Sequence, residues 1–237
     1  NAVIFEKNAH KKLPMASTTK IMTLLVALEN SNPEDVVTVS KTAVSEEGSS
    51  AYLKPGARIT MRDLCYGLML NSGNDAAVAI AEHISETTDD FAEFMNDTAK
   101  RTGILNTHFV NPNGLHDDNH FTTASDLARL TRYALQNDTF REIVSSGMYT
   151  STMLMPDGTI QNVEYINHNR LLKELDGCIG VKTGFTKTAG RCLVSAVNRN
   201  GAEYVIVTLN DSDDWNTHKE LCELAFDTMS ERNIVKK

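Results

Sequence analysis

Three short groups of polar residues have the types and spacing that acyl transfer on a serine requires. They are Ser17-Thr18-Thr19-Lys20, Ser72-Gly73-Asn74 and Lys182-Thr183-Gly184. A serine hydroxyl is a weak nucleophile until a base removes its proton. A lysine can be that base only when burial or a nearby cation lowers its pKa. The three groups therefore predict an activated serine, provided that the fold brings the two lysines close to it.

The first group lies at the start of an expected helix. Ser17 and Lys20 are three residues apart, so their side chains share one helix face. The amino-terminal end of a helix favours developing negative charge through its dipole and its free amides. Lys182 would be the cation that lowers the pKa of Lys20. For this motif alone, a plain N-cap serine and a solvated lysine remain the alternative, because short motifs also arise by chance.

The second and third groups would complete such a site. Ser72 and Asn74 fall between two expected helices, where Ser72 could relay a proton and Asn74 could hold a substrate. Lys182 and Thr183 follow an apolar run and would offer a charge and a hydroxyl to a substrate carboxylate. Gly184 would let a substrate backbone approach closely. Taken separately, these residues also suit a helix cap and a strand that runs into a glycine turn.

The elements that must position these groups change character along the chain. Apolar residues at helical spacing predict helices in the first two thirds and at the end. These helices are expected over 17–29, 77–84, 91–95, 123–134 and 221–228. Short apolar runs predict strands in the last third, with Asn200-Gly201 as a hairpin turn. They cover 178–183, 192–197 and 204–209, and an edge strand or hairpin is expected at 2–5.

This order of elements predicts an α/β (α+β) fold, in which a mainly antiparallel sheet is interrupted by a helical region. We expect a single catalytic unit over 1–237. Its sheet lobe would comprise about 1–30 and 151–237, and its mostly helical lobe about 31–150. The site would lie in a cleft between the two lobes.

Composition excludes several classes of protein. Of the 237 residues, 41% are hydrophobic and 23% charged, which is ordinary for a globular protein. The formal net charge of −8 and the lack of a basic stripe argue against nucleic-acid binding. The chain has no run of about 18 apolar residues, so no membrane-spanning helix is expected.

The cysteines and histidines suggest no metal site. Four cysteines without a C-x-x-C pair exclude a zinc knuckle; Cys178 and Cys192 could meet beside a hairpin, or all four could be small buried side chains. His116 and His120 have the i, i+4 spacing of helical metal ligands. However, Asn113-Gly114 indicates a loop there, and neither H-E-x-x-H nor a glycine-rich phosphate loop is present. We expect no metal and no cofactor.

The three motifs in this order are those of penicillin-binding proteins and class A β-lactamases. Over nearly its whole length, the chain resembles the D-alanyl-D-alanine carboxypeptidases, the low-mass penicillin-binding proteins of serine peptidase family S11. The resemblance implies the serine β-lactamase/DD-peptidase-like fold, with the site between the sheet and the helical lobe. The stretches that carry it are 13–23, 71–77, 113–116, 122–127 and 180–186.

The resemblance implies a role for each catalytic residue. Ser17 would attack the bond between the two D-alanines at the end of a peptidoglycan stem peptide, with Lys20 as the base. Ser72 and Asn74 would assist proton transfer, and Lys182 would bind the terminal carboxylate. Water would then release the acyl group. Penicillins would acylate the same serine and leave slowly.

Further residues would bind the substrate. Thr183 would share the carboxylate, and the backbone amide of Phe185 would form the oxyanion hole with that of the nucleophile. Gly184 and Gly73 would lie against the substrate. Phe185 replaces a histidine that some relatives carry, which leaves the main-chain amide intact. Some relatives have a carboxylate-binding arginine near the last helix, and we expect His218 at that place to share the role.

Rival functions remain at this stage. A class A-like β-lactamase needs a glutamate in an E-x-x-L-N loop, which the chain lacks, and Gly73 stands where those enzymes usually carry Asp. A non-catalytic β-lactam sensor shares the serine and the lysine but needs a transmembrane signalling partner. A structural wall-binding module would not need an activated serine or all three motifs. The resemblance also implies a location outside the cytoplasmic membrane, reached through a signal peptide absent from the printed sequence. Any membrane anchor or carboxy-terminal domain would likewise lie in segments absent from it.

Overall fold

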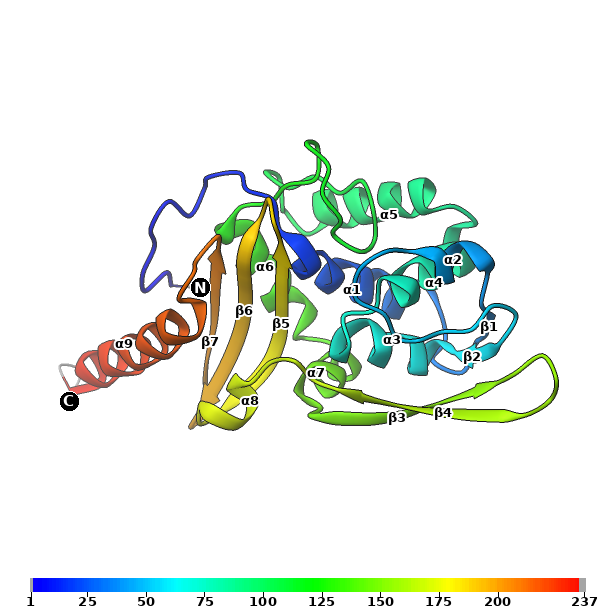
Figure 1. Ribbon diagram of the computed structural model, residues 1–237. Helices are drawn as coiled ribbons and strands as arrows, with labels where there is room; N and C mark the ends of the chain where they lie inside the picture. Colours follow the sequence, from blue (N-terminus) through cyan, green and yellow to red (C-terminus); the bar gives the residue numbers. More distant parts are fainter. Residues whose placement is uncertain (1, 235–237) are drawn as a thin grey trace.

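The computed structural model describes residues 2–234 and contains two antiparallel sheets in that range (Figure 1). The third motif lies on the three-stranded sheet, whose strand order is β5-β6-β7. Its strands are β5 (Cys178–Thr186), β6 (Gly190–Arg199) and β7 (Ala202–Leu209). The second sheet has the order β1-β2-β3-β4. Its strands are β1 (Val36–Thr38), β2 (Arg58–Thr60), β3 (Met148–Leu154) and β4 (Ile160–Ile166).

Helices make up most of the remaining described chain, as Figure 1 shows. They are the 3-10 helix η1 (Ala16–Thr19), α1 (Lys20–Asn30), α2 (Lys41–Ser45), α3 (Met61–Leu70), α4 (Asn74–Ser85), α5 (Thr88–Arg101), α6 (Ala124–Ala134), α7 (Asp138–Ser145), α8 (Leu171–Glu174) and α9 (Asp214–Ile234). The expected helices and the three strands of the last third are confirmed. The hairpin at Asn200 and Gly201 is confirmed too, since both residues have the positive φ of a type I′ turn.

Helix α1 runs through the interior. Every residue from Lys20 to Ala27 is buried, because α3, α4, α5, α6 and α7 surround it and a helix that is apolar all round needs such cover. The 3-10 turn η1 precedes α1 and packs against β5. Because α1 is enclosed by other helices, its first residue and the preceding turn η1 have a fixed place beside the sheet.

The two faces of the three-stranded sheet belong to different cores, as the period of two in a strand requires. Val194 and Ala196 of β6 face the main core with α1. Leu193 and Val197 face a second cluster, which contains Cys222 of α9 and the partly buried Trp215. In Figure 1, α9 leaves the sheet on the side away from the helical region. One strand thus contributes to both cores.

The boundary between the lobes differs from the expected one. Strands β3 and β4 form a hairpin that pairs with β2 through Arg58 and Leu154, and β2 pairs with β1. The segment 148–166 therefore joins the helical region, and the sheet lobe does not begin at 151. Figure 1 shows this hairpin along one side of the helical elements.

One local expectation is wrong, and one of the two alternatives for the cysteines is excluded. Residues 2–5 form no strand, and Val3 and Phe5 are exposed. Cys178 and Cys192 do not meet, because Cys178 pairs with Val197 across the ladder while Cys192 pairs with Gly184. All four cysteines are free thiols. Within residues 2–234, none of the helices has the length and apolar character needed to cross a membrane.

Candidate active site

The first motif forms a short turn that presents Ser17 next to Lys20. Ser17 is half-buried on η1, and Lys20 is the fully buried first residue of α1. The Nζ of Lys20 lies 3.1 Å from the Oγ of Ser17. Ala16, just before the serine, has a φ of +47°, a left-handed conformation that costs an L-residue roughly 1–2 kcal/mol. Strain of this kind is found where the surrounding structure holds a functional turn.

Two carbonyl oxygens fix the ammonium group of Lys20. Its Nζ donates to the side-chain Oδ1 of Asn74 at 2.7 Å and to the backbone oxygen of Asn113 at 2.6 Å. When the amine is neutral, these two acceptors take its two N–H bonds, since neither can donate. The lone pair is then left toward Ser17. Lys20 is thus oriented to accept the proton of the serine hydroxyl.

The electrostatic surroundings favour that neutral amine. Burial lowers the pKa of Lys20 well below its ordinary value, and the nearby charge of Lys182 lowers it further. Asp75 and Glu46 act in the opposite direction. Burial also lowers the pKa of Lys182, to about 7. Lys182 can therefore exchange a proton near neutral pH, and the lowered pKa of Lys20 favours the neutral amine that a general base requires.

The second and third motifs contact each other through Ser72 and Lys182, between the end of α3 and strand β5. The Nζ of Lys182 on β5 donates to the Oγ of Ser72 at 3.0 Å and to the backbone oxygen of Thr183 at 2.9 Å. Ser72 lies in the turn between α3 and α4, and its φ of +59° is again left-handed. Lys182 and Ser72 thus form a second lysine–serine pair beside the first.

Strand β5 closes one side of the nucleophile. A Cβ on Gly184 would lie 3.0 Å from the backbone nitrogen of Ser17, which is tighter than ordinary contact, so glycine allows this approach. Thr183 and Gly184 are half-buried, whereas the Phe185 side chain is 66% exposed. The edge of β5 therefore presents its backbone next to the amide of Ser17.

Comparison with known proteins agrees with this arrangement. The family model described as "D-alanyl-D-alanine carboxypeptidase", peptidase family S11, matches residues 1–213. The chain belongs to peptidase family S11. The family resemblance read from the sequence is thereby confirmed.

Two named carboxypeptidases and one crystal structure are similar to this protein over most of its chain. D-alanyl-D-alanine carboxypeptidase DacF of Bacillus subtilis is 34% identical over 89% of this chain, and the chain spans 54% of that relative's length. The D-alanyl-D-alanine carboxypeptidase of Streptomyces sp. strain K15 is 36% identical over 84% of this chain and 72% of the relative. A crystal structure titled Streptomyces K15 DD-transpeptidase has a TM-score of 0.83 at 36% identity and covers 87% of this chain and 84% of that one. The expected mixed α/β fold is confirmed.

Two of the expected substrate-binding residues, His218 and Gly73, are buried and are not placed to contact a substrate. His218 on α9 is completely buried, with Nδ1 2.7 Å from the Oγ of Ser195 and Nε2 3.0 Å from the Oγ1 of Thr208. Neither ring nitrogen is left for a carboxylate, so the expectation for His218 is corrected. Gly73, between Ser72 and Asn74, is buried, and a Cβ on it would lie 2.8 Å from the Cβ of Ala51, so this glycine allows the turn to pack closely on Ala51.

The sequence did not reveal the loop that supports Lys20 and Asn74. The Nδ2 of Asn113 donates to Oε1 of Glu46 at 2.8 Å, and the Nδ2 of Asn74 donates to the backbone oxygen of Glu47 at 2.6 Å. Both ends of the Asn74 amide are thus engaged, so in this state it holds Lys20. The turn at Asn113 was visible in the sequence, but the use of its main-chain oxygen was not.

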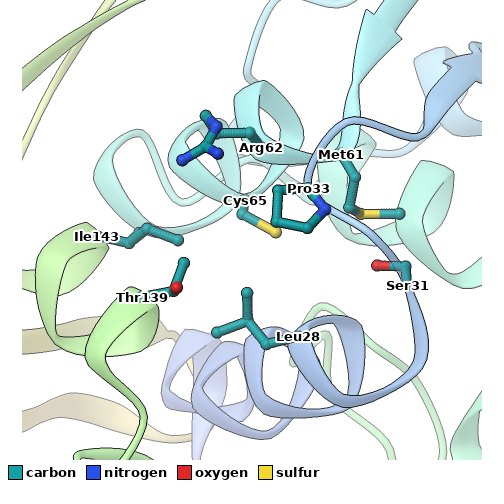
Figure 2. Close-up of a pocket in the computed structure, with 8 residues that line it drawn as sticks. All are labelled: Leu28, Ser31, Pro33, Met61, Arg62, Cys65, Thr139 and Ile143. Carbon is teal, nitrogen blue, oxygen red and sulfur yellow. The ribbon is translucent and has the colours of Figure 1, made fainter.

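Two other features contribute no side chain to the two lysine–serine pairs. His116 stands beside Asp118, whereas His120 is buried with both ring nitrogens hydrogen-bonded, so the pair is not arranged as ligands of one ion. The pocket in Figure 2 lies between α1, α3 and α7 and is lined by residues such as Leu28, Cys65 and Ile143. This pocket, of about 10 Å³, offers room for about one water molecule. It is too small to hold a peptide.

Proposed function

We propose that this chain is the catalytic part of a serine-type D-Ala-D-Ala carboxypeptidase. It removes the terminal D-alanine from peptidoglycan stem peptides through an acyl-enzyme on Ser17. The supporting observation is the buried Lys20 amine, 3.1 Å from Ser17 Oγ, with its other donors taken by Asn74 and Asn113. The chain spans about half the length of the Bacillus subtilis relative.

Acylation uses both lysines. Lys20 takes the proton of Ser17 as Oγ attacks the carbonyl carbon of the penultimate D-alanine, and a tetrahedral oxyanion forms. The backbone amides of Ser17 and Phe185 receive this oxyanion. Each preorganised donor of such a hole is commonly worth about 10²–10³ in rate. The positive charge of Lys182 and the hydroxyl of Thr183 attract the terminal carboxylate of the peptide.

Collapse of the tetrahedral intermediate breaks the peptide bond. The leaving nitrogen of D-alanine needs the proton that Lys20 took from Ser17. Ser72, hydrogen-bonded to Lys182 at 3.0 Å, is placed to pass this proton on, which leaves Lys20 neutral again. Water then attacks the acyl-enzyme, with Lys20 again as base, and frees Ser17. A penicillin would acylate Ser17 by the same first steps. Since peptidoglycan lies outside the cytoplasmic membrane, the proposed substrate favours a location of the enzyme on that side.

Two measurements with one control variant test this function. D-alanine release is followed on a peptide ending in D-Ala-D-Ala, and intact mass is recorded after incubation with benzylpenicillin. We expect peptide cleavage and a drug adduct that persists for minutes, both lost in Ser17→Ala. Rapid destruction of penicillin without an adduct would identify a β-lactamase instead, and an adduct without peptide cleavage would identify a sensor. Transfer of the acyl group to an added amine in preference to water would identify a transpeptidase.

A further inference from the structure

His120 lies close to the nucleophile turn, although it is remote in sequence from Ser17. It is buried, and its Nε2 lies 2.7 Å from the Oγ1 of Thr19. The hydroxyl of Thr19 in turn donates to the backbone oxygen of Ala16 at 2.8 Å. A continuous line of short contacts therefore leads from the imidazole to the residue before the nucleophile.

The direction of every hydrogen bond in this line is determined. The backbone N–H of Val110 donates to Nδ1 of His120 at 3.1 Å, so Nδ1 carries no proton. In a neutral imidazole the proton then resides on Nε2, which must donate to Thr19. Burial lowers the pKa of His120 to about 4, which agrees with a neutral ring. Since Thr19 accepts from the ring, its own proton is directed to the oxygen of Ala16.

The oxygen of Ala16 and the N–H of Ser17 are the two ends of one peptide group. A peptide group is planar and trans, so a hydrogen bond that fixes the oxygen also fixes the direction of the N–H. That N–H is one donor of the oxyanion hole. Donation to the oxygen also polarises the group, which strengthens the N–H as a donor.

A second contact holds the same peptide group. The backbone of Gly114 packs so closely on Ala16 that a Cβ there would lie 2.0 Å from the Ala16 oxygen. Gly114 and His120 belong to one loop between α5 and α6. The loop therefore restrains this carbonyl by packing and by the hydrogen-bonded line, and Ala16 keeps its left-handed φ between them.

We propose that His120 and Thr19 are positioning residues for the oxyanion hole, acting through the peptide group of Ala16 and Ser17. The inference rests on the proposed function, because it assigns the Ser17 amide to an oxyanion. It differs from a purely structural role in one respect. The positioning role requires a proton donor at the Nε2 position of residue 120, which faces Thr19. A purely structural role would depend on the other contacts of the loop.

Two substitutions of His120 separate these roles. His120→Asn places an oxygen near the Nδ1 position, so it can still accept from Val110 but gives Thr19 no donor. His120→Gln can reach Thr19 with its amide nitrogen but leaves Val110 without its acceptor. If His120 is only structural, His120→Gln should slow acylation more than His120→Asn. If His120 is a positioning residue, His120→Asn should slow acylation more. Thr19→Val and Thr19→Ser form a second matched pair, without and with the hydroxyl.

The measurement is the rate constant of benzylpenicillin acylation at saturating drug, together with the apparent drug affinity and the melting temperature. We expect His120→Asn and Thr19→Val each to slow acylation about tenfold or more, with affinity unchanged. His120→Gln and Thr19→Ser should stay within about threefold of wild type. The double variant His120→Asn/Thr19→Val should be no slower than the slower single variant, because both break one line.

The outcomes separate this inference from the proposed function. If the wild-type chain is neither acylated nor active on the peptide, the proposed function fails before any variant is compared. If wild type is acylated and His120→Asn matches its rate, or if the two defects multiply in the double variant, the positioning role alone is overturned. If His120→Asn does not fold, the Thr19 pair decides, and equal rates for Val and Ser would overturn the proposal.

Discussion

The two faces of the three-stranded sheet each bury an ionisable side chain, and they use it differently. Toward the helical region, Lys182 of β5 contacts Ser72 in the turn before α4. Toward α9, Ser195 of β6 contacts His218. Burial lowers the pKa of both groups, to about 7 for Lys182 and about 3 for His218. Burial and a shifted pKa are therefore shared by a site of chemistry and a site of packing.

The partners of the two groups make the difference. Both nitrogens of His218 are occupied by hydroxyls of the sheet, Ser195 and Thr208, so the ring has no free position. Lys182 contacts a serine that can itself pass a proton on, and it lies close enough to lower the pKa of Lys20. A perturbed pKa therefore indicates function only where the group also contacts a partner with which it can exchange a proton.

The largest expected effect lies on the Lys182 face. Lys182→Met keeps the length of the side chain and removes its charge and its donor to Ser72. We expect penicillin acylation to slow roughly 10³-fold, because the carboxylate and the proton path both lose this group. Stability should not fall, since a buried amine no longer has to be desolvated. An acylation rate within tenfold of the wild-type rate would contradict a catalytic role for Lys182.

The next effect lies on the α9 face. His218→Ala removes two buried hydrogen bonds and leaves a cavity, so we expect the free energy of unfolding to fall by about 2–3 kcal/mol. The kcat/KM for peptide should stay within about twofold, which differs from the carboxylate-binding role expected from the sequence. Urea unfolding and D-alanine release measure the two quantities. An increase in KM with unchanged stability would restore the earlier assignment.

The same variant tests the pH dependence of stability. The folded-state pKa of His218, about 3, lies below the ordinary value of 6.5, so the unfolded chain binds the proton more readily. The stability that depends on its neutral ring is complete above pH 6.5 and is lost as the pH falls toward 3. Between pH 6.5 and 5 this amounts to about 2 kcal/mol, from about 1.4 kcal/mol per pH unit. His218→Ala should therefore lose less stability over this range than wild type; equal losses would contradict the prediction.

The smallest effect concerns the charges around Lys20. Glu46 raises the pKa of Lys20, while burial and Lys182 lower it and Asp75 acts with Glu46. Glu46→Gln can keep the hydrogen bond to Asn113 and removes only the charge. The ascending limb of the acylation pH profile should then move to lower pH, because the pKa of Lys20 loses a contribution that raises it. Glu47→Gln is the matched control, because Glu47 contacts Asn74 through its backbone and its side chain is exposed. A shift in the control, or none in Glu46→Gln, would contradict this assignment.

Periodicity and motif spacing were sufficient to predict what depends on local sequence. Helix α1 and the hairpin of β6 and β7 follow from patterns within a few residues. The S-x-x-K spacing correctly anticipated the contact of Ser17 with Lys20. These features need no knowledge of distant partners.

Features that depend on distant partners were missed or misplaced. The acceptor at Asn113 is a main-chain oxygen, which residue type does not reveal. Placing His218 required knowing which side of α9 meets the sheet. The apolar run at 2–5 lacks a paired strand in the structure, so its composition alone was misleading.

The position of Trp215 gives the molecule a built-in optical label. It is the sole tryptophan in the sequence, and it packs in the α9 cluster beneath the guanidinium groups of Arg170 and Arg191. Its fluorescence therefore reports on the docking of α9 and is separated by the sheet from events at Ser17. We expect the Trp215 emission to stay constant during acylation and to change on acidification. Fluorescence would then report on the packing of α9, while mass spectrometry reports on acylation of Ser17.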